Sequence, residues 1–398
     1  MKQYIKLLKN EYVLRRLSTI QLISYFGAWF SNVAIYTLLI EMDVSAGVIA
    51  LVAALHFLPG VLQAPVSGTF IDRLAPKKLM LWLLSIEIVS TLSLLMVQDI
   101  SLLWLLYIII FIRMGAASFY FTAEMSLLPR ILHHDHLKQA NEIHSVIWSF
   151  SYTVGMAVSG FVVYALGVKA AFVLDALLFF IGFLLLFNVK IDVIVTQSGE
   201  SVIRMMKKTF TYLKENKHVL HLMFVHSLVG LTSFDAVVAL MVDRYYSAVI
   251  ATSLALGLMH SSRAVGLVFG PVFLGKWIND KRLLYLFLFQ GIALFVWSYV
   301  MEYFYLSLLA SVFVGFFTTT LWSYSYTLIQ HKTDKEYYGR IVAYNDMIFL
   351  TVASVTSLLT GELAKIGFSL QSIVAYMAAA FFMSSIYYAW IYKRYIRG

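Results

Sequence analysis

Stretches of about 20 consecutive apolar residues recur from one end of the chain to the other, separated by short polar segments. Each stretch is long enough to cross the ~30 Å hydrocarbon core of a bilayer as an α-helix. Transmembrane strands would instead alternate over about 10 residues, so they are excluded. The pattern predicts twelve spans, at residues 17–40, 46–70, 79–97, 102–125, 142–166, 169–189, 219–242, 251–276, 283–300, 304–329, 339–362 and 369–392.

The composition agrees with a protein whose solvent is lipid. The 398 residues are 61% hydrophobic and 13% charged, whereas soluble domains have about 25% charged residues. The longest polar segment, at 190–217, is too short for a soluble domain. Within it, apolar residues recur at helical spacing opposite basic ones, which predicts an interfacial amphipathic helix, although a calmodulin-type partner site has the same pattern. The apolar positions are Val202, Ile203, Met206, Phe210 and Leu213.

The 30 Lys and Arg residues are distributed unevenly between the two ends of the predicted spans. One end carries both termini and the segment 190–217 and holds most of these residues. The loops at the opposite end have only Lys169, Arg244 and Lys365. Because positively charged loops stay in the cytoplasm, both termini are expected there. The net charge of +9 is therefore a topology signal, and a nucleic-acid partner is not predicted.

Short matches separated by about half the chain indicate an internal duplication. GTFIDR at Gly68–Arg73 matches GKWIND at Gly275–Asp280, and Gly115 in span four matches Gly315 in span ten. Two parallel halves of six helices place a substrate site near the membrane midplane between them. The predicted fold is an all-α membrane protein, with an N-terminal bundle at 1–189, a linker at 190–217 and a C-terminal bundle at 218–398.

The loop between spans two and three carries the most specific motif, GTFIDRLAPKK, which resembles the loop signature of the major facilitator superfamily. SYFGAWFSNVA in span one, LPRILHHDHLKQAN after span four and AAFVLDALLFF in span six add to a resemblance that covers the whole chain. Together they resemble the branch of macrolide-efflux proteins and exporters of siderophores such as enterobactin. The resemblance implies the major facilitator fold and a transporter, without a particular substrate. The key positions of the signature are Gly68, Asp72, Arg73, Lys77 and Lys78.

This loop is also a candidate gate. Asp72 follows the end of span two, beside a basic cluster, and a contact that costs at most roughly a few kcal/mol to break suits a switch between two nearly equal states. The resemblance implies that Asp72 contacts the start of span eleven, at Gly339 and Arg340. The alternative is that the basic residues only fix topology. Asn279 stands at the Asp72 position of the second copy, so the switch is expected to be stronger in the first half.

Span five departs from the family. Efflux antiporters of this superfamily often carry Gly-x-x-x-Gly-Pro-x-x-Gly-Gly there. Gly155 and Gly160 are kept, whereas Met156 replaces the proline and Ser159 replaces one glycine. The degenerate match weakens the inference of drug/proton antiport and leaves export open. Gly155, Ser159 and Gly160 remain predicted packing positions.

Charged residues inside the spans are candidate site residues, since each costs about 2.5–3.5 kcal/mol at mid-bilayer unless it faces a partner or water. Glu87 and Arg113 lie at matching depth on consecutive spans, Asp235 and Arg263 match more loosely, and Asp346 has no obvious partner. By resemblance, spans 1, 4, 7 and 10 line the cavity and spans 2, 5, 8 and 11 flank it. Asp235 and Asp346 are the first candidates for proton coupling, and structural ion pairs are the alternative.

Other polar residues have competing interpretations. Asp175, near the outer interface, is expected to be structural. His56 and His260 could titrate near neutral pH, although isolated membrane histidines usually serve packing. The HHDH run at His133–His136 has metal-ligating residue types, but it lies in a cytoplasmic loop without further ligands nearby, so no metal is predicted.

Aromatic residues beside hydroxyl groups suit an amphipathic organic substrate, because they offer flat apolar area and polar contacts. Span ten contributes Trp322 and Thr319, and span five contributes Trp148 and Tyr152. Aromatic belts at the membrane interfaces are the alternative explanation.

The sequence contains no phosphate loop, catalytic triad or nucleotide-binding domain, so neither an enzyme nor an ATP-driven pump is predicted. We predict a monomeric, proton-coupled exporter of a small amphipathic molecule (a drug, siderophore or peptide antibiotic) in the bacterial cytoplasmic (inner) membrane. It would use the proton gradient and no cofactor, with the substrate and the lipid bilayer as its partners. An importer, a lipid flippase or a non-transporting scaffold are the alternatives.

Overall fold

The computed structural model describes residues 2–191, 202–334 and 337–397. Over these residues the secondary structure is helical, without strands, as predicted. Ten helices among them are long and apolar enough to cross a membrane, judged by length and composition. This number differs from the twelve predicted spans at two places. Spans five and six fall within one helix, α7 (His134–Phe187), and α11 (Thr252–Leu274), at span eight, is not among the ten.

The chain divides into two compact units. Unit 1 comprises Met1–Met42 and Pro65–Gly199, and unit 2 comprises Asp43–Ala64 and Glu200–Gly398. The segment Asp43–Ala64 groups with unit 2 because α3 (Ala46–Leu55) packs along α14 (Tyr338–Lys365). The division predicted from the sequence, with a linker at 190–217, stays a prediction.

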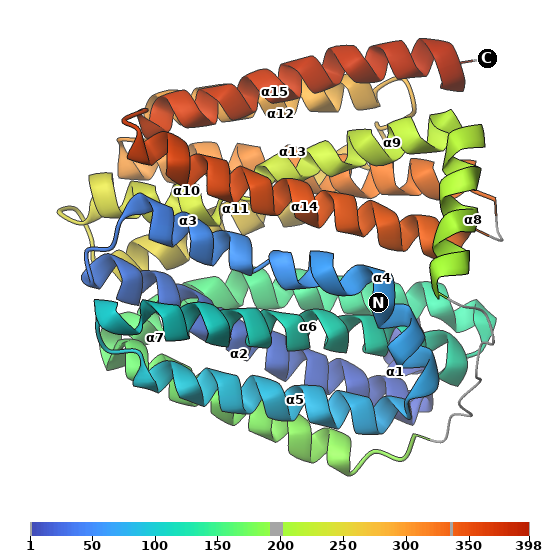
Figure 1. The fold of residues 1–398 in the computed structure, drawn as a ribbon, viewed down its shortest axis with the longest axis horizontal. Helices are drawn as coiled ribbons and strands as arrows, with labels where there is room; N and C mark the ends of the chain where they lie inside the picture. The colour runs from blue at the N-terminus through green and yellow to red at the C-terminus, as the bar shows by residue number, and fades with distance from the viewer. Residues whose placement is uncertain (1, 192–201, 335–336, 398) are drawn as a thin grey trace. The chain divides into compact units, whose positions relative to one another are not determined.

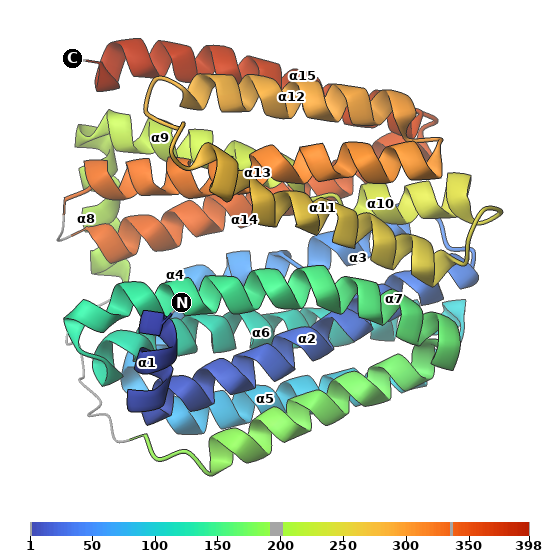
Figure 2. The ribbon, with the colours of Figure 1, turned by 180° about the vertical axis from the view of Figure 1, so that it is seen from behind.

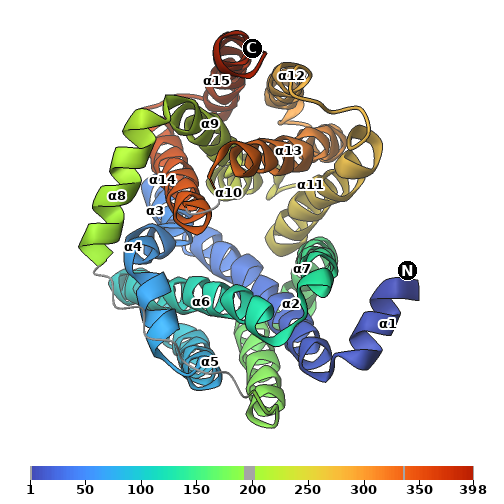
Figure 3. The same cartoon turned by 90° about the vertical axis from the view of Figure 1, so that its right-hand side faces the viewer.

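In unit 1, α2 packs along α7, and α5 packs on both α6 and α7 (Figures 2 and 3). Leu17, Met80 and Leu127 are buried at its centre, while Trp82 on α5 is 72% exposed. Large apolar side chains on an outer face are expected where the solvent is lipid. The elements are α1 (Lys2–Asn10), α2 (Tyr12–Glu41), α4 (Leu58–Arg73, which crosses the unit boundary), α5 (Pro76–Ser93), η1 (Leu94–Met96), η2 (Ile100–Leu102), α6 (Leu103–Ile131) and α7.

Helix α7 contains a sharp turn at Gly167, where φ is +84°. This left-handed conformation is open to glycine and costly for other residues. No atom lies within 4 Å of the position that a Cβ would occupy, so the requirement for glycine is one of backbone conformation. The turn connects the two segments that the sequence predicts as spans five and six.

In unit 2, α12 lies beside α15, and α11 packs along α13 (Figures 1 and 2). Helix α8 (Val202–Glu215) crosses the end of α14, where Tyr212 stacks on Tyr337 with 4.2 Å between ring centroids. The remaining elements are α9 (Lys217–Ser227), η3 (Leu228–Thr232), α10 (Asp235–Met241), η4 (Val242–Tyr246), α12 (Leu283–Val300), α13 (Phe304–Lys332), α15 (Leu370–Ile391) and η5 (Tyr392–Ile396).

Local sequence signals fix several helix ends. Pro76 is the first residue of α5. A backbone N–H at this position would have no partner within the helix, so proline, which lacks one, costs nothing there. The Asp99 carboxylate caps η2 by accepting hydrogen bonds from the Ser101 hydroxyl (2.5 Å) and the Ser101 N–H (2.8 Å). These bonds favour the charged form and lower the pKa of Asp99.

The packing of α11 against α13 gives a stability prediction. A Cβ added at Gly315 would lie 2.0 Å from the carbonyl oxygen of Arg263, a backbone atom that cannot move alone. We expect Gly315→Ala to lower the free energy of unfolding by about 1–3 kcal/mol, measured as a lower melting temperature in detergent. The matched control is Gly47→Ala, whose Cβ would meet nothing closer than 3.8 Å. Equal melting temperatures for the two variants would contradict this contact.

Candidate functional site

The seventh predicted span is broken in its middle. Helix α9 ends at Ser227, the 3-10 turn η3 runs to Thr232, and α10 starts at Asp235. Gly230 makes the break possible by lying against α14, where an added Cβ would be 2.8 Å from the carbonyl oxygen of Phe349. This span is also the most buried of the ten, with 83% of its apolar window inside the protein. Interrupted membrane helices expose backbone groups and polar side chains for binding or coupling.

Asp235, His260 and Arg263 meet at this break, and we call them the span-seven site. Arg263 of α11 donates from Nη2 to the carbonyl oxygen of Thr232 (3.1 Å), and its guanidinium carbon lies 4.9 Å from the centroid of the Phe234 ring. His260, also on α11, places Nε2 3.8 Å from Oδ1 of Asp235 and interacts electrostatically with Arg263. A carboxylate, an imidazole and a guanidinium therefore share one position in the bundle.

Water access differs within the span-seven site. The Asp235 side chain is 22% exposed, whereas that of His260 is 2% exposed. The carboxylate is therefore the group of the pair that solvent reaches. The two groups form a carboxylate–imidazole pair with one partly exposed and one buried member.

An aromatic cluster surrounds His226 one turn before the break. The His226 ring lies 5.6 Å from Trp322, 5.3 Å from Tyr326 and 5.7 Å from Phe349, measured between centroids. Its Nδ1 is 2.8 Å from the hydroxyl of Ser325. Trp322 stacks on Tyr326 with 5.0 Å between centroids and is 40% exposed. The cluster thus combines a fixed, buried base with an accessible aromatic face.

Two further predicted residues of unit 2 lie close to this cluster along the chain. Thr319 is half-buried, one turn before Trp322 on α13. Asp346 is half-buried on α14, one turn before Phe349, so it shares that helix face. Its Oδ1 accepts a 3.4 Å hydrogen bond from Asn345, and no basic side chain in the described ranges pairs with it.

Unit 1 holds a separate buried network. Arg113 on α6 donates to Oδ2 of Asp175 on α7 (2.8 Å) and to the hydroxyl of Thr91 on α5 (3.0 Å). Ser31 of α2 donates to the same Asp175 oxygen. Arg113 was expected at the depth of Glu87, but its ion pair is with Asp175. Glu87 is also buried and interacts electrostatically with both. Asp175 therefore connects α7 with α2 and α6, and through Arg113 with α5; its structural role stays a prediction.

Glu124 was not identified from the sequence. It is buried on α6, and its Oε2 accepts no hydrogen bond from any described residue. Tyr25 and Tyr120 interact with it electrostatically. A buried carboxyl group with an unpaired oxygen is costly, so Glu124 is a candidate functional residue. The only sequence signal was an acidic residue near the end of an apolar run.

The span-five positions support packing between α7 and α2. A Cβ on Gly155 would lie 2.6 Å from Cδ1 of Trp29, and Ser159 donates to the carbonyl oxygen of Trp29 (2.8 Å); Gly160 is buried. Tyr152 is buried between Trp29 and Trp148, at 4.7 and 5.4 Å between centroids. Trp148 is the exposed member of this stack.

The predicted gate falls mostly outside the described residues. The backbones of Gly68, Asp72 and Arg73 lie in α4 and that of Gly339 lies in α14, but the side chains of Asp72 and Arg73 are outside the described set. Lys77 donates to the carbonyl oxygen of Phe187 (2.8 Å), and Lys78 is exposed. Arg340 lies over the ring of Tyr337, 5.1 Å from its centroid. The contact of Asp72 with span eleven stays a prediction.

The remaining histidines have local partners. His56 places Nδ1 2.8 Å from the carbonyl oxygen of Val52, one turn earlier in its helix. In the HHDH run, His136 pairs with Glu11 at 3.4 Å, while the side chains of His134 and Asp135 are outside the described set. Among the described residues, no group of three or more His, Asp or Glu side chains could hold a metal ion.

Comparison with known proteins gives the family. The sequence profile described as Major Facilitator Superfamily matches residues 17–356, so the chain belongs to this superfamily of membrane transporters, as the loop signature indicated. Macrolide efflux protein A of Streptococcus pyogenes is 24% identical over 333 residues, which is 81% of this chain and 82% of that protein. The uncharacterized MFS-type transporter YfiS of Bacillus subtilis is 29% identical over 182 residues, covering 46% and 43% of the two chains.

Solved structures show the same fold at low sequence identity. The nucleoside transporter NupG superposes with a TM-score of 0.75 at 12% identity, covering 96% of this chain and 99% of NupG. A bacterial homologue of the human lysosomal transporter Spinster superposes with a TM-score of 0.76 at 12% identity, covering 97% of each chain. The protein is therefore a multi-pass membrane protein with the fold of major facilitator transporters.

The buried network of unit 1 gives a second stability prediction. Asp175→Asn keeps the side-chain shape but leaves the Arg113 guanidinium without its counter-ion, so we expect unfolding to become easier by about 3–5 kcal/mol. The control is Lys365→Gln, which breaks an exposed 3.9 Å pair with Glu362 and should cost about 0–1 kcal/mol. Thermal unfolding in detergent compares the two. An Asp175→Asn variant as stable as Lys365→Gln would rule out the network as a stabilising element.

Proposed function

We propose that the protein is a proton-coupled exporter of small amphipathic organic molecules, working by alternating access in the bacterial cytoplasmic membrane. In this proposal twelve spans form two six-helix bundles, both termini are cytoplasmic, and a monomer is the working unit. The proposed proton coupling is argued from the pairing of Asp235 with His260 at the break in span seven. Export is supported by the similarity to macrolide efflux protein A.

In the proposed cycle, Asp235 takes up a proton when its side of the break is open to water and releases it when the break is closed. Arg263 carries a positive charge and is held at the break by the carbonyl oxygen of Thr232. Protonation removes the attraction between Asp235 and this positive environment, which changes the balance between two conformations of similar free energy. Glu124 is a second candidate proton carrier, because it is buried without a cationic neighbour in the described structure.

The aromatic cluster supports the proposed substrate class. Trp322 and Tyr326 present stacked rings, and Asp346 lies on the helix face that carries Phe349. Flat apolar surface next to a carboxyl group suits a molecule with both apolar and polar parts. The apolar part of such a molecule would pack on the rings, and its polar groups would fix its orientation.

The coupling is tested with Asp235→Asn. In inside-out vesicles with an imposed proton gradient, we expect uptake of a transported macrolide, siderophore or lipophilic dye to fall at least about tenfold, because the group that titrates is lost; tenfold corresponds to ~1.4 kcal/mol. Exchange of labelled for unlabelled substrate without a gradient should persist. Glu362→Gln, an exposed carboxylate on α14, is the control.

Other results would decide between the alternatives. Full gradient-driven uptake by Asp235→Asn would remove Asp235 from the coupling. Gradient-driven movement in the opposite direction would indicate an importer, and movement of labelled phospholipid would indicate a flippase. If the native protein transports none of the candidate molecules, the non-transporting scaffold is the alternative that remains.

The substrate surface is tested with Trp322→Ala. Removing the accessible ring should weaken substrate binding by about 5–10-fold, since an aromatic contact contributes about 1 kcal/mol. The effect should appear in the concentration for half-maximal exchange rather than in proton coupling. Trp82→Ala is the matched control, because Trp82 is exposed on the outer face of unit 1. Equal binding by the two variants would contradict the assignment of Trp322.

A further inference from the structure

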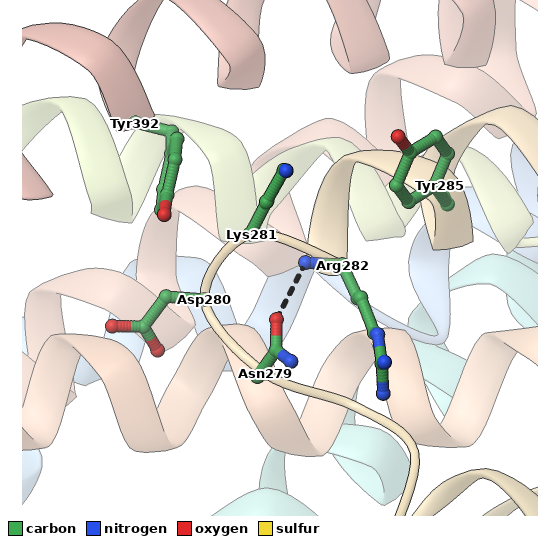
Figure 4. Close-up of a pocket in the computed structure, with 6 residues that line it drawn as sticks. All are labelled: Asn279, Asp280, Lys281, Arg282, Tyr285 and Tyr392. Atoms are coloured by element: carbon green, nitrogen blue, oxygen red, sulfur yellow. Dashed lines mark hydrogen bonds between the residues drawn. The ribbon is translucent and has the colours of Figure 1, made fainter. Parts of the chain in front are cut away.

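Unit 2 contains a polar pocket of about 610 Å³ in the loop between α11 and α12. Figure 4 shows its lining, with Lys281 and Tyr392 on one side of the loop and Tyr285 at the start of α12. The loop is the second copy of the duplicated motif, and by charge distribution it lies at the cytoplasmic end of the spans. The lining residues are Asn279, Asp280, Lys281, Arg282, Tyr285 and Tyr392.

The carboxylate in the pocket is already engaged by the bundle. Asp280 accepts a 2.6 Å hydrogen bond from the hydroxyl of Tyr324, and its main-chain oxygen accepts one from Tyr388 (2.8 Å). Lys281 is exposed, and no described acidic side chain pairs with it. The positive charge of Lys281 is therefore available to a ligand.

The loop backbone is held rigid around this lysine. The Asn279 side chain accepts from the N–H of Arg282 (2.9 Å), as Figure 4 shows. The Arg282 guanidinium donates to the carbonyl oxygen of Trp277 (2.7 Å) and lies 5.3 Å from the centroid of its ring. A positively charged pocket with a fixed backbone binds an anion at little cost in ordering.

Basic residues dominate the surrounding sequence. The segments 276–282 and 392–397 contain six basic residues and one acidic residue, Asp280. Arg394 adds a stacked guanidinium, 5.5 Å from the ring centroids of both Trp390 and Tyr395. Cationic side chains among Trp and Tyr are typical of protein surfaces at the level of lipid headgroups.

An apolar stripe leads away from the pocket along α12. It begins at Tyr285 and continues at Ile292, Phe295 and Tyr299, which recur at intervals of seven, three and four residues and so share one helix face. All four side chains are exposed, Tyr299 to 83%. A ligand with a polar anionic end in the pocket and hydrocarbon chains on this stripe would contact both surfaces, whereas a free phosphate ion would use only the first.

We propose that this pocket binds the phosphate-bearing headgroup of an anionic phospholipid, with its acyl chains along the exposed face of α12. Lys281 supplies the charge, and the hydroxyl groups of Tyr285 and Tyr392 supply hydrogen-bond donors. The site is separate from the span-seven site and the aromatic cluster, and it does not depend on the proposed transport function.

The experiment titrates the delipidated full-length protein in detergent with phosphatidylglycerol and measures bound lipid by native mass spectrometry. We expect Lys281→Gln to weaken binding of the first phosphatidylglycerol about fivefold, the effect of one basic residue near an anionic headgroup. Lys276→Gln, which removes an exposed lysine of the same loop outside the pocket lining, should bind like the native protein. Melting temperatures without lipid should be equal for all three, since both lysines are exposed.

Two further titrations identify the source of the phosphate group. Phosphatidylcholine should bind more weakly than phosphatidylglycerol and respond little to Lys281→Gln. Inorganic phosphate at millimolar concentration should not displace the bound lipid. The proposal is overturned if the two lysine variants lose binding equally, if phosphatidylcholine binds as tightly as phosphatidylglycerol, or if inorganic phosphate displaces the lipid and binds in its place.

Discussion

An ionised side chain inside a membrane protein must be paired, hydrogen-bonded or wetted, because lipid supplies neither charge nor hydrogen bonds. In unit 1 the Arg113 guanidinium meets this requirement through Asp175 and Thr91. In unit 2 the Arg263 guanidinium meets it through a main-chain carbonyl that the break in span seven has released. The same constraint thus produces a closed ion pair in one unit and an open polar site in the other.

This difference distinguishes a cluster that stabilises the fold from one that is available for chemistry. Arg113 and Asp175 are both buried and paired at 2.8 Å, so removing the charge of one partner would cost stability. The Asp235–His260 pair has a longer separation of 3.8 Å, and its carboxylate is partly exposed while its imidazole is buried. The proposed proton coupling therefore belongs at the broken helix, whereas the Arg113 network is expected to stabilise the fold.

The sequence predicted the helices and the family better than it predicted the partners within the site. The length of the apolar runs and the GTFIDRLAPKK loop depend on local chemistry, so both could be recognised directly. Depth along two spans says nothing about the direction in which each side chain points. It placed Glu87 at the level of Arg113, with which Glu87 does interact electrostatically, but it could not show that Asp175 holds the ion pair. The break in span seven contains no proline, and the close packing of Gly230 on α14 at this point is seen only in the folded chain.

The glycine contacts between α11 and α13 have a mechanical consequence. At Gly266, Gly270 and Gly315 the two backbones are so close that an added Cβ would lie within 2.0 Å of a main-chain oxygen. Such a contact leaves no room for one helix to slide past the other, so α11 and α13 are expected to move together as one rigid pair. Arg263 and His260 on one helix and Trp322 on the other would then keep a constant spacing during any rearrangement of unit 2.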